Sequence, residues 1–169
     1  HQGVLAILSA VTYESLANLV PSIYEEGRVP FIVLLDGVSD VRNFGAIART
    51  CECAGVDAIV IPKRGGVGVN GDAMKTSAGA LNYLPVCRET SILNAVKFLK
   101  DSGCRICAAS EKSRTNYTAP DYTGPVAIVM GAEDVGISPD ILRFCDTTVS
   151  IPQAGNIGSL NVSVAAGVM

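Results

Sequence analysis

A glycine-rich stretch in the first half of the chain has the spacing of a dinucleotide-binding turn. Gly66-Val67-Gly68-Val69-Asn70-Gly71 fits the pattern G-x-G-x-x-G, and Glu89 follows 18 residues after the last glycine. In such a turn the glycines let the backbone approach a pyrophosphate. Here Pro62 to Gly65 separate the preceding apolar run from the first glycine, whereas that motif needs the turn at the end of the strand. We therefore predict a flexible loop, with a nicotinamide or flavin cofactor as the alternative.

Histidine and cysteine give little support for triad or metal chemistry. The single histidine is His1, so a Ser-His-Asp or Cys-His device would depend on a terminal residue. Among six cysteines, Cys51 and Cys53 fall in a helical pattern, where residues two apart point about 200° apart. Cys104 and Cys107 fall in a strand-like run, where residues three apart face opposite sides. We predict no metal site and expect buried, reduced thiols.

Other polar residues that could bind or react gather in segments that follow apolar runs. In open parallel sheets, the loops beyond the carboxyl ends of the strands form the ligand site. We therefore expect the chemistry of this chain in four loops, at residues 36–49, 62–71, 131–138 and 152–163.

Composition restricts the class of protein. The chain has 169 residues, of which 49% are hydrophobic and 17% charged, which is enough apolar surface for one core and excludes a disordered chain. No apolar run reaches the roughly 18 to 20 residues that span a bilayer, so we expect no membrane segment. The formal net charge of −3 does not indicate a nucleic-acid binder, so any such function must depend on a local site.

Short apolar runs alternate with segments of helical period. Continuous hydrophobicity within the runs predicts one α/β domain, a parallel sheet with helices on both faces. We predict strands at 31–35, 58–61, 84–87, 105–109, 126–130 and 148–151, and helices at 43–55, 72–81, 91–100, 139–144 and from about 160. Residues 12–26 predict a peripheral helix that breaks or kinks at Pro21, and residues 111–124 an exposed, mobile loop.

Three of the polar loops carry a resemblance to a known family. They read DGVSDVRNFGAIAR from Asp36, IVMGAEDVGIS from Ile128 and IPQAGNIGSLNVS from Ile151. Together and in this order they resemble the SpoU/TrmH branch of the SPOUT methyltransferases, which transfer a methyl group from S-adenosylmethionine to a ribose 2′-hydroxyl in RNA. The opening His1-Gln2-Gly3-Val4 and the run Leu160-Asn161-Val162-Ser163 are most similar to the bacterial enzymes that modify a guanosine of 23S rRNA.

The resemblance implies a fold, an assembly and a cofactor site. The fold would be a parallel α/β sheet with a C-terminal deep trefoil knot, and residues 1–169 would form the SPOUT catalytic domain. A small N-terminal RNA-binding domain and the last part of the C-terminal helix would lie outside this chain. The protein would be a cytoplasmic homodimer with its active site close to the interface. The residues that match those holding S-adenosylmethionine are Met130, Gly131, Gly136, Ile151 and Leu160.

The same resemblance implies a polar active-site set, namely Asn43, Arg49, Glu133, Ser159 and Asn161. Methyl transfer needs alignment of hydroxyl, methyl and sulfur, and loss of a proton from a weakly acidic hydroxyl. A guanidinium stays protonated, so we interpret Arg49 as a ligand of the RNA phosphate beside the target ribose that also stabilises developing negative charge. Glu133 is the candidate proton acceptor, or else it orients Arg49 or Asn43. For Asn43, Ser159 and Asn161 the alternative role is a helix N-cap.

Three functions stay open at this point. The first is an S-adenosylmethionine-dependent RNA 2′-O-methyltransferase acting on rRNA or, alternatively, tRNA. The second is a nicotinamide-dependent oxidoreductase, and the third a non-catalytic RNA-binding module on a knotted scaffold. The joint presence of the polar set favours the first. Five basic residues could add phosphate contacts, with a solvated surface charge as the alternative for each: Arg42, Lys63, Arg64, Lys75 and Arg114.

Overall fold

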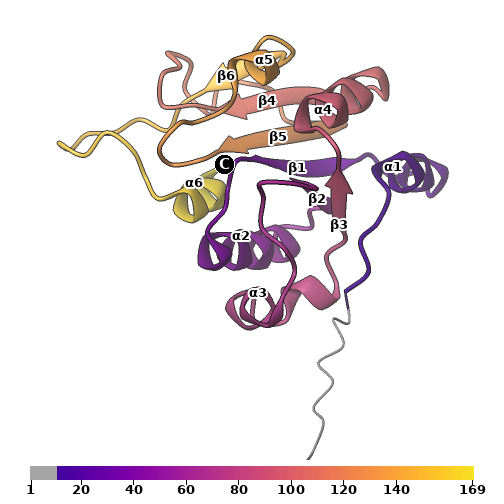
Figure 1. Ribbon diagram of the computed structural model, residues 1–169. Coiled ribbons are helices and arrows are strands. Elements are labelled where there is room, and N and C mark those ends of the chain that lie inside the picture. The colour runs from indigo at the N-terminus through magenta and orange to yellow at the C-terminus, as the bar shows by residue number, and fades with distance from the viewer. Residues whose placement is uncertain (1–10) are drawn as a thin grey trace, which may run out of the picture.

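Six parallel strands form a single sheet in the computed structural model, which describes residues 11–169 (Figure 1). The strands are β1 (Phe31–Asp36), β2 (Ala58–Pro62), β3 (Val86–Glu89), β4 (Arg105–Ala109), β5 (Val126–Gly131) and β6 (Thr147–Val149). Their order in the sheet is β3-β2-β1-β5-β4-β6, and all neighbouring strands run parallel. The predicted parallel sheet is thereby confirmed. His1 and the opening run His1-Gln2-Gly3-Val4 lie outside the described residues.

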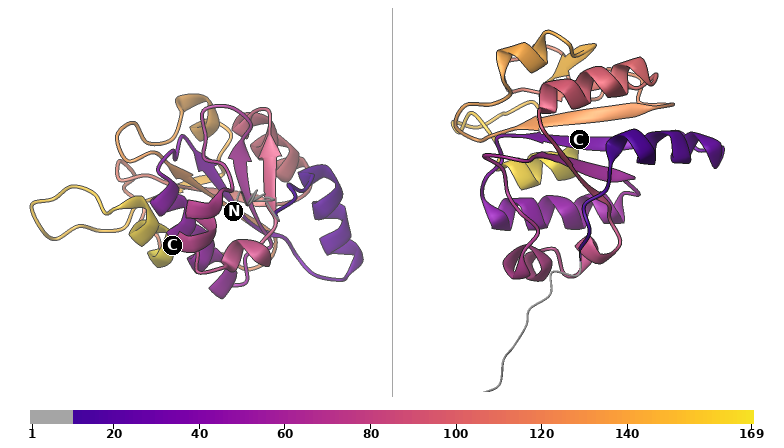
Figure 2. Two further views of the ribbon diagram at one scale, coloured as in Figure 1. Left: turned by 60° about the horizontal axis from the view of Figure 1, so that its bottom comes forward. Right: turned by 45° about the vertical axis from the view of Figure 1, so that its right-hand side comes forward.

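Helices cover both faces of the sheet, as predicted (Figures 1 and 2). One face carries α2 (Val41–Cys53), α3 (Gly71–Thr76) and α6 (Val162–Val168), and the other carries α1 (Leu16–Glu25), α4 (Ile92–Asp101) and α5 (Pro139–Leu142). Alternate residues of β1 pack into the two resulting cores. Val33 and Leu35 pack on the α2 side, and Ile32 and Leu34 on the α4 side. Because both faces are buried, the strands read as continuous apolar runs.

The predicted helix at 72–81 is divided into two parts. Helix α3 ends at Thr76, and a separate 3-10 turn, η1, covers Ala80–Asn82. Between them Ala78 and Gly79 have φ angles of +52° and +83°, which an α-helix cannot contain. The other predicted elements start and end within about two residues of the observed ones, except the helix predicted at 12–26, which begins at Leu16.

Of the predicted break or kink at Pro21, the break is wrong, because α1 continues through this residue, and the kink stays a prediction. Leu16, Val20 and Ile23 recur at helical spacing and are each at most 2% exposed, so packing on the sheet holds the helix together. Proline cannot donate a hydrogen bond to the carbonyl of Ala17, four residues earlier, but Ala17 is exposed and water can satisfy that carbonyl.

The segment 111–124 is mostly exposed, as predicted, and is tied to the neighbouring edge strand. Tyr117 N donates to Ser150 O at 3.0 Å, and Ser150 N donates to Thr115 O at 2.8 Å. Ser113 Oγ donates to Thr148 O at 2.7 Å. These bonds fix the middle of the loop beside β6, and its predicted mobility stays a prediction.

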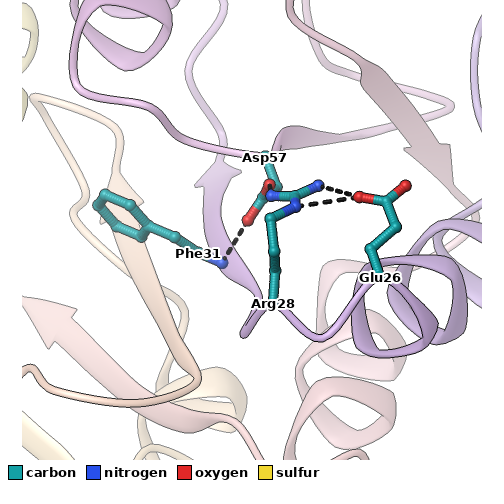
Figure 3. A network of polar contacts seen from close by, with 4 residues as sticks. All are labelled: Glu26, Arg28, Phe31 and Asp57. Atoms are coloured by element: carbon teal, nitrogen blue, oxygen red, sulfur yellow. Dashed lines mark hydrogen bonds and ion pairs between the residues drawn. The ribbon is translucent and has the colours of Figure 1, made fainter.

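The amino end of β1 is fixed by a carboxylate that bridges two elements (Figure 3). Asp57, just before β2, accepts a hydrogen bond from Phe31 N at 2.9 Å and one from Arg28 Nη1 at 2.6 Å. The Arg28 guanidinium also donates to Glu26 at 2.8 and 3.0 Å. The network therefore sets where β1 begins, opposite the strand ends at which a ligand is expected. Among the residues that the structure describes, no helix is long and apolar enough to cross a membrane.

Candidate active site

The direction of the strand order reverses between β1 and β5. From β1 the chain builds outward through β2 to β3, and it then crosses to β4 and β5 on the other side. Ligands of such sheets bind beyond the carboxyl ends of the strands at this switch point. The polar loops at 36–49 and 131–138 leave β1 and β5 at this point, so the topology brings them together. The glycine-rich loop leaves the adjacent strand, β2.

The chain after β5 turns back over the end of its own strand. Gly136 N donates to Ala132 O at 2.8 Å, and a Cβ on Gly131 would lie 2.4 Å from the carbonyl carbon of Gly136 and 2.5 Å from Ile137 N. Only glycine fits at such a crossing, and Gly136 adopts a φ of +69° that also favours glycine. The crossing therefore combines a close backbone approach at Gly131 with a positive φ at Gly136.

Asp36, the last residue of β1, holds both ends of this loop. Its carbonyl oxygen accepts a hydrogen bond from Ala132 N at 3.0 Å. Its Oδ2 accepts hydrogen bonds from Ser138 N and Ser138 Oγ, both at 2.7 Å. The loop that carries Glu133 is therefore anchored on the neighbouring strand.

Three of the predicted polar residues meet in one group, called here the amide cluster: Asn43, Glu133 and Asn161. Asn161 Nδ2 donates to Glu133 Oε1 at 2.6 Å and to Asn43 Oδ1 at 3.0 Å. Asn43 Nδ2 lies 3.5 Å from Glu133 Oε1, and Val162 N donates to that same oxygen at 3.0 Å. The cluster thus joins the start of α2, the loop after β5 and the start of α6.

Helix capping separates the roles of the two asparagines. The N-cap of α2 is Asp40, whose Oδ1 accepts a hydrogen bond from Asn43 N at 2.9 Å. The alternative N-cap role is therefore wrong for Asn43, whose side chain is free to join the cluster. Asn161 is the N-cap of α6, because its Oδ1 accepts from Ser163 N at 3.0 Å, and it serves the cluster through its Nδ2. Ser159 precedes this helix and does not cap it.

Glu133 contacts Asn43, and no hydrogen bond or ion pair joins it to Arg49 within the described residues. Glu133 Oε1 accepts the hydrogen bonds of the cluster, while no hydrogen bond from the described residues reaches Glu133 Oε2. Arg49 lies on α2 six residues after Asn43, is exposed, and makes no ion pair or side-chain hydrogen bond with the part of the chain that the structure describes. The structure therefore leaves the Arg49 guanidinium available to a ligand but does not bring it into the amide cluster.

A hollow beside the amide cluster is lined by all five residues expected at the cofactor site, namely Met130, Gly131, Gly136, Ile151 and Leu160. Glu133 and Ser159 also line it. Its enclosed part measures about 90 Å³, and its mouth is open. The segment Gln153 to Ser159 is exposed and projects away from the body of the molecule between β6 and α6 (Figures 1 and 2).

The lining of this hollow fits an adenosyl group. Met130, Val149 and Leu160 offer apolar surface for adenine. The carboxylates of Glu111 and Glu133 can accept hydrogen bonds from the ligand and attract a positive charge on it. Sequence reasoning missed Ser110 and Glu111, which also line the hollow. They follow β4, so the rule that loops at strand ends converge could have found them.

The glycine-rich loop packs against the core through two of its side chains, and its predicted flexibility stays a prediction. Val67 and Val69 are buried in the core below α2, and Val69 N donates to Tyr13 Oη at 3.0 Å. A Cβ on Gly66 would lie 2.8 Å from Pro62, so this glycine serves chain packing. The loop does not offer the open backbone turn that a pyrophosphate needs, which removes the support for a nicotinamide cofactor.

The cysteines are scattered and mostly buried. Cys51, Cys87, Cys104 and Cys107 are buried as expected, whereas Cys53 is exposed. Burial raises the pKa of the Cys51 and Cys87 thiols to about 12. No group of three or more His, Cys, Asp or Glu side chains within residues 11–169 is placed to hold a metal ion.

The basic residues expected to bind phosphate lie on several different elements. Arg42 forms an ion pair with Asp40, with 3.9 Å between Arg42 Nη2 and Asp40 Oδ2. Lys75 lies on α3, and Arg114 lies in the 111–124 loop. Lys63 and Arg64 directly follow β2 at the carboxyl edge of the sheet. This pair and Arg42, which is next to Asn43 at the start of α2, both follow the carboxyl ends of strands that border the candidate site.

The known proteins that are similar to this chain are described as methyltransferases or RNA-modifying enzymes of the SpoU or TrmH type. A family model described as the SpoU rRNA Methylase family matches residues 30–169. TrmH family tRNA/rRNA methyltransferases of Staphylococcus saprophyticus and Bacillus subtilis are each 36% identical over all 169 residues, which cover 68% of each relative.

Solved structures agree with these matches. An AdoMet-bound rRNA methyltransferase from Sinorhizobium meliloti is 26% identical with a TM-score of 0.81, over 93% of this chain and 58% of that one. The A. aeolicus TrmH/SpoU tRNA modifying enzyme is 30% identical with a TM-score of 0.76, over 83% of this chain and 72% of that one. The chain thus spans about two thirds of the curated relatives and 58% of the Sinorhizobium protein.

Proposed function

The chain belongs to the SpoU rRNA methylase family, a family of RNA methyltransferases, and from this premise we propose that it methylates a ribose 2′-hydroxyl of RNA with S-adenosylmethionine. The observation that carries the proposal is the amide cluster at the rim of the hollow beyond β5. The proposed substrate is a guanosine of 23S rRNA, with tRNA as the alternative. The similar proteins include both an rRNA methyltransferase and a tRNA modifying enzyme, so both RNAs are tested below.

The proposed cofactor site is the hollow lined by Met130, Gly131, Gly136, Ile151 and Leu160. When bound, S-adenosylmethionine supplies the methyl group on a positively charged sulfur. The chain contributes an apolar slot for adenine and a carboxylate rim. Because the enclosed part of the hollow is small, we expect the exposed segment 153–159 to fold over the cofactor and exclude water.

The amide cluster positions the acceptor ribose. Asn161 fixes Asn43 and Glu133 in a single arrangement, which aligns a hydroxyl more effectively than mobile side chains would. Glu133 Oε2, which no hydrogen bond from the described residues reaches, is the proposed acceptor of the hydroxyl proton. Arg49 is proposed to bind the phosphate beside the target ribose and to stabilise developing negative charge. Ser159 is proposed to contact the substrate at the mouth of the hollow.

The proposed assembly is a homodimer built on the outer face of α6. Val164 and Val168 lie one helical turn apart and are 53% and 39% exposed, and neither they nor their neighbours on α6 carry a charge. An apolar stripe of this kind beside the active site suits a second copy of the chain. Val164→Glu should shift the sedimentation coefficient from dimer to monomer, whereas Lys97→Glu on α4 should leave it unchanged.

Three further expectations complete the proposal. Residues 1–169 form the catalytic domain, and the segment between β6 and α6 threads a trefoil knot. A knotted chain pulled from both ends in an optical trap should reach a shorter extended length than its residue count allows. The RNA substrate implies a cytoplasmic location.

Binding and transfer assays test the proposal. Calorimetric titration with S-adenosylhomocysteine should give saturable binding, and NADH should give none. Unmodified rRNA and tRNA should then be offered with methyl-labelled S-adenosylmethionine, and the modified linkage should resist alkaline hydrolysis, because a methylated 2′-oxygen cannot attack the neighbouring phosphate. Binding of NADH alone would contradict the proposal. Binding of S-adenosylhomocysteine without transfer to either RNA would favour a non-catalytic RNA-binding module.

A further inference from the structure

An arginine at the carboxyl end of β3 has no carboxylate partner. Arg88 makes no ion pair with any described residue, and its buried Nε has no hydrogen-bond partner. Its Nη2 donates to Lys63 O at 3.1 Å, and its guanidinium carbon lies 4.5 Å from the centre of the Tyr13 ring. A half-buried guanidinium without a counter-ion is costly, and the remaining N–H groups of such a side chain suit an oxyanion.

Arg88 lines an open pocket of about 500 Å³, together with Tyr13, Glu14, Ser15, Lys63 and Glu89. The glycine-rich loop supports this pocket, because Val69 N donates to Tyr13 Oη and thereby fixes the ring on which Arg88 stacks. This contact gives the loop a structural role that its sequence pattern did not predict.

We call this open pocket the edge pocket. Its charges favour an anion that contacts both Lys63 and Arg88. Glu14 and Glu89 balance Lys63 and Arg88 in formal charge, but no carboxylate oxygen lies within 4 Å of either cation. A phosphate oxygen in contact with Arg88 and Lys63 would therefore be closer to both positive charges than either carboxylate is. A bound phosphate can use the guanidinium N–H groups that the protein leaves unpaired.

The edge pocket lies on the same sheet edge as the amide cluster. Lys63 follows β2 and Arg88 lies in β3, one and two strands away from β1. With neighbouring strands about 4.8 Å apart, the end of β3 is about 10 Å from the end of β1. A single RNA strand that leaves the proposed reaction site can cross this distance within a few nucleotides.

We infer that Arg88 and Lys63 bind a backbone phosphate of the RNA substrate, a few nucleotides away from the methylated ribose. The inference rests on the proposed function, because it needs an RNA at the carboxyl edge of the sheet. Such a contact positions the RNA strand and reads no base. The pocket therefore sets the path of the strand across β2 and β3.

The test is the salt dependence of RNA binding, measured with the full chain and the rRNA or tRNA that it methylates. Lys63→Gln and Arg88→Gln should each weaken binding about tenfold. Each should also lower the slope of log affinity against log salt, and the double variant Lys63→Gln/Arg88→Gln should lower it by about 0.7 to 1, the value for one lost phosphate contact. Arg88→Lys keeps the charge and should keep the slope. Glu14→Gln should strengthen binding, because it removes a repulsive charge from the pocket.

Lys97→Gln is the matched control, because it makes the same change in net charge on α4, away from the carboxyl edge, and it should leave affinity and slope unchanged. Calorimetry with S-adenosylhomocysteine should give the wild-type affinity for each variant, which shows that the fold is intact. Lys63 is exposed, so its variant tests the inference even if Arg88→Gln fails to fold.

The outcomes are distinct. Unchanged affinity and slope in Lys63→Gln would overturn the inference, while methylation by the wild-type protein would leave the proposed function standing. Weaker binding with the wild-type slope would show that the pocket holds a base, and would also overturn the phosphate assignment. If the wild-type protein methylates no RNA, the proposed function itself fails and the inference fails with it.

Discussion

The side-chain amide of Asn161 links three segments that are distant in the sequence. Its nitrogen donates to Glu133 and Asn43, while its oxygen caps α6. Asn43, in contrast, caps nothing, since Asp40 holds that position. The two asparagines therefore differ in how much of the fold depends on them. Substituting each in turn can separate an effect on substrate positioning from an effect on folding stability.

Asn43→Ala should lower turnover about 100-fold and leave the affinity for S-adenosylhomocysteine within about twofold, because the proposed role of this side chain is to align the acceptor and it does not line the cofactor hollow. Single-turnover methyl transfer and calorimetry measure the two quantities. Asn161→Ala is the comparison variant, since it also removes a helix cap and should cost about 1 kcal/mol of unfolding free energy. A large loss of cofactor affinity with unchanged turnover would contradict the role given to Asn43.

Thiol reactivity should follow burial. Cys53 is exposed, whereas burial raises the pKa of the Cys104 and Cys145 thiols to about 11 and that of Cys107 above its usual value. Because thiolates are the reactive form, dithionitrobenzoate at pH 7.5 should rapidly modify one thiol of the native protein and all six in denaturant. Cys53→Ser should abolish the rapid phase. Two or more rapid equivalents would show that the described core opens readily.

At the scale of elements, the turn after β5 depends on the absence of a side chain at Gly131. Gly131→Ala would place a Cβ 2.4 Å from the backbone of Gly136, which cannot move aside without dislodging the loop that carries Glu133. We expect a loss of about 3 kcal/mol in unfolding free energy, or failure to fold, as for overpacked sites. Urea denaturation of Gly155→Ala, which meets no atom within 4 Å, is the control and should stay within about 0.5 kcal/mol of wild type. Equal stability of both variants would contradict this account of the crossing.

The elements that could be predicted from the sequence are those with an unambiguous apolar period. Residues 31–35 and 126–130 are continuous apolar runs, so their burial between two helical layers follows directly. The break after Thr76 was missed because Ala78 is a good helix former that here adopts a positive φ, although the following Gly79, also at positive φ, is a residue type that commonly ends helices. The continuous α1 was mispredicted for the opposite reason, since tertiary packing outweighs the local cost of Pro21.

At the scale of the whole molecule, the meeting of Asn43, Glu133 and Asn161 could not be derived from spacing. The three residues belong to loops whose separation in sequence says nothing of their distance in space, and only the family resemblance grouped them. The resemblance also placed Arg49 with them, whereas the structure leaves it on the exposed side of α2. Lys63 was expected to contact phosphate, but its grouping with Tyr13 and Arg88 in the edge pocket was missed, because the three residues carry no joint pattern.

The stability of the whole molecule depends on pH in part through Asp146, whose carboxylate links β4 to α4. Partial burial alone would raise the pKa of Asp146, but hydrogen bonds from Ile106 N and Lys100 Nζ outweigh it and hold the pKa below its ordinary value. A carboxylate with a lowered pKa in the folded state stabilises the protein above its unfolded pKa of about 3.9, and this contribution is lost as pH falls through the folded value.

Asp146→Asn should therefore lower the melting temperature at pH 7, where the native carboxylate is charged in both states. The difference between variant and wild type should shrink as pH falls below about 4, because the wild-type carboxylate then becomes protonated and loses its advantage. Thermal unfolding followed by circular dichroism at pH 7, 4 and 3 measures it. Asp140→Asn, an exposed carboxylate paired only with Arg143, is the control and should show little difference at any pH. A difference that grows on acidification would contradict the assignment.

The hydrogen bond between Asn161 and Asn43 joins residues that are 118 positions apart, and this separation has a consequence during synthesis. A ribosome adds about 5–20 residues per second, so roughly 6 to 24 s pass between the incorporation of the two asparagines. During that interval β1 and α2 can form, yet the nascent polypeptide lacks the last member of its amide cluster. An incomplete translation product that stops before Asn161 should therefore never acquire a finished active site, even if its sheet has already assembled.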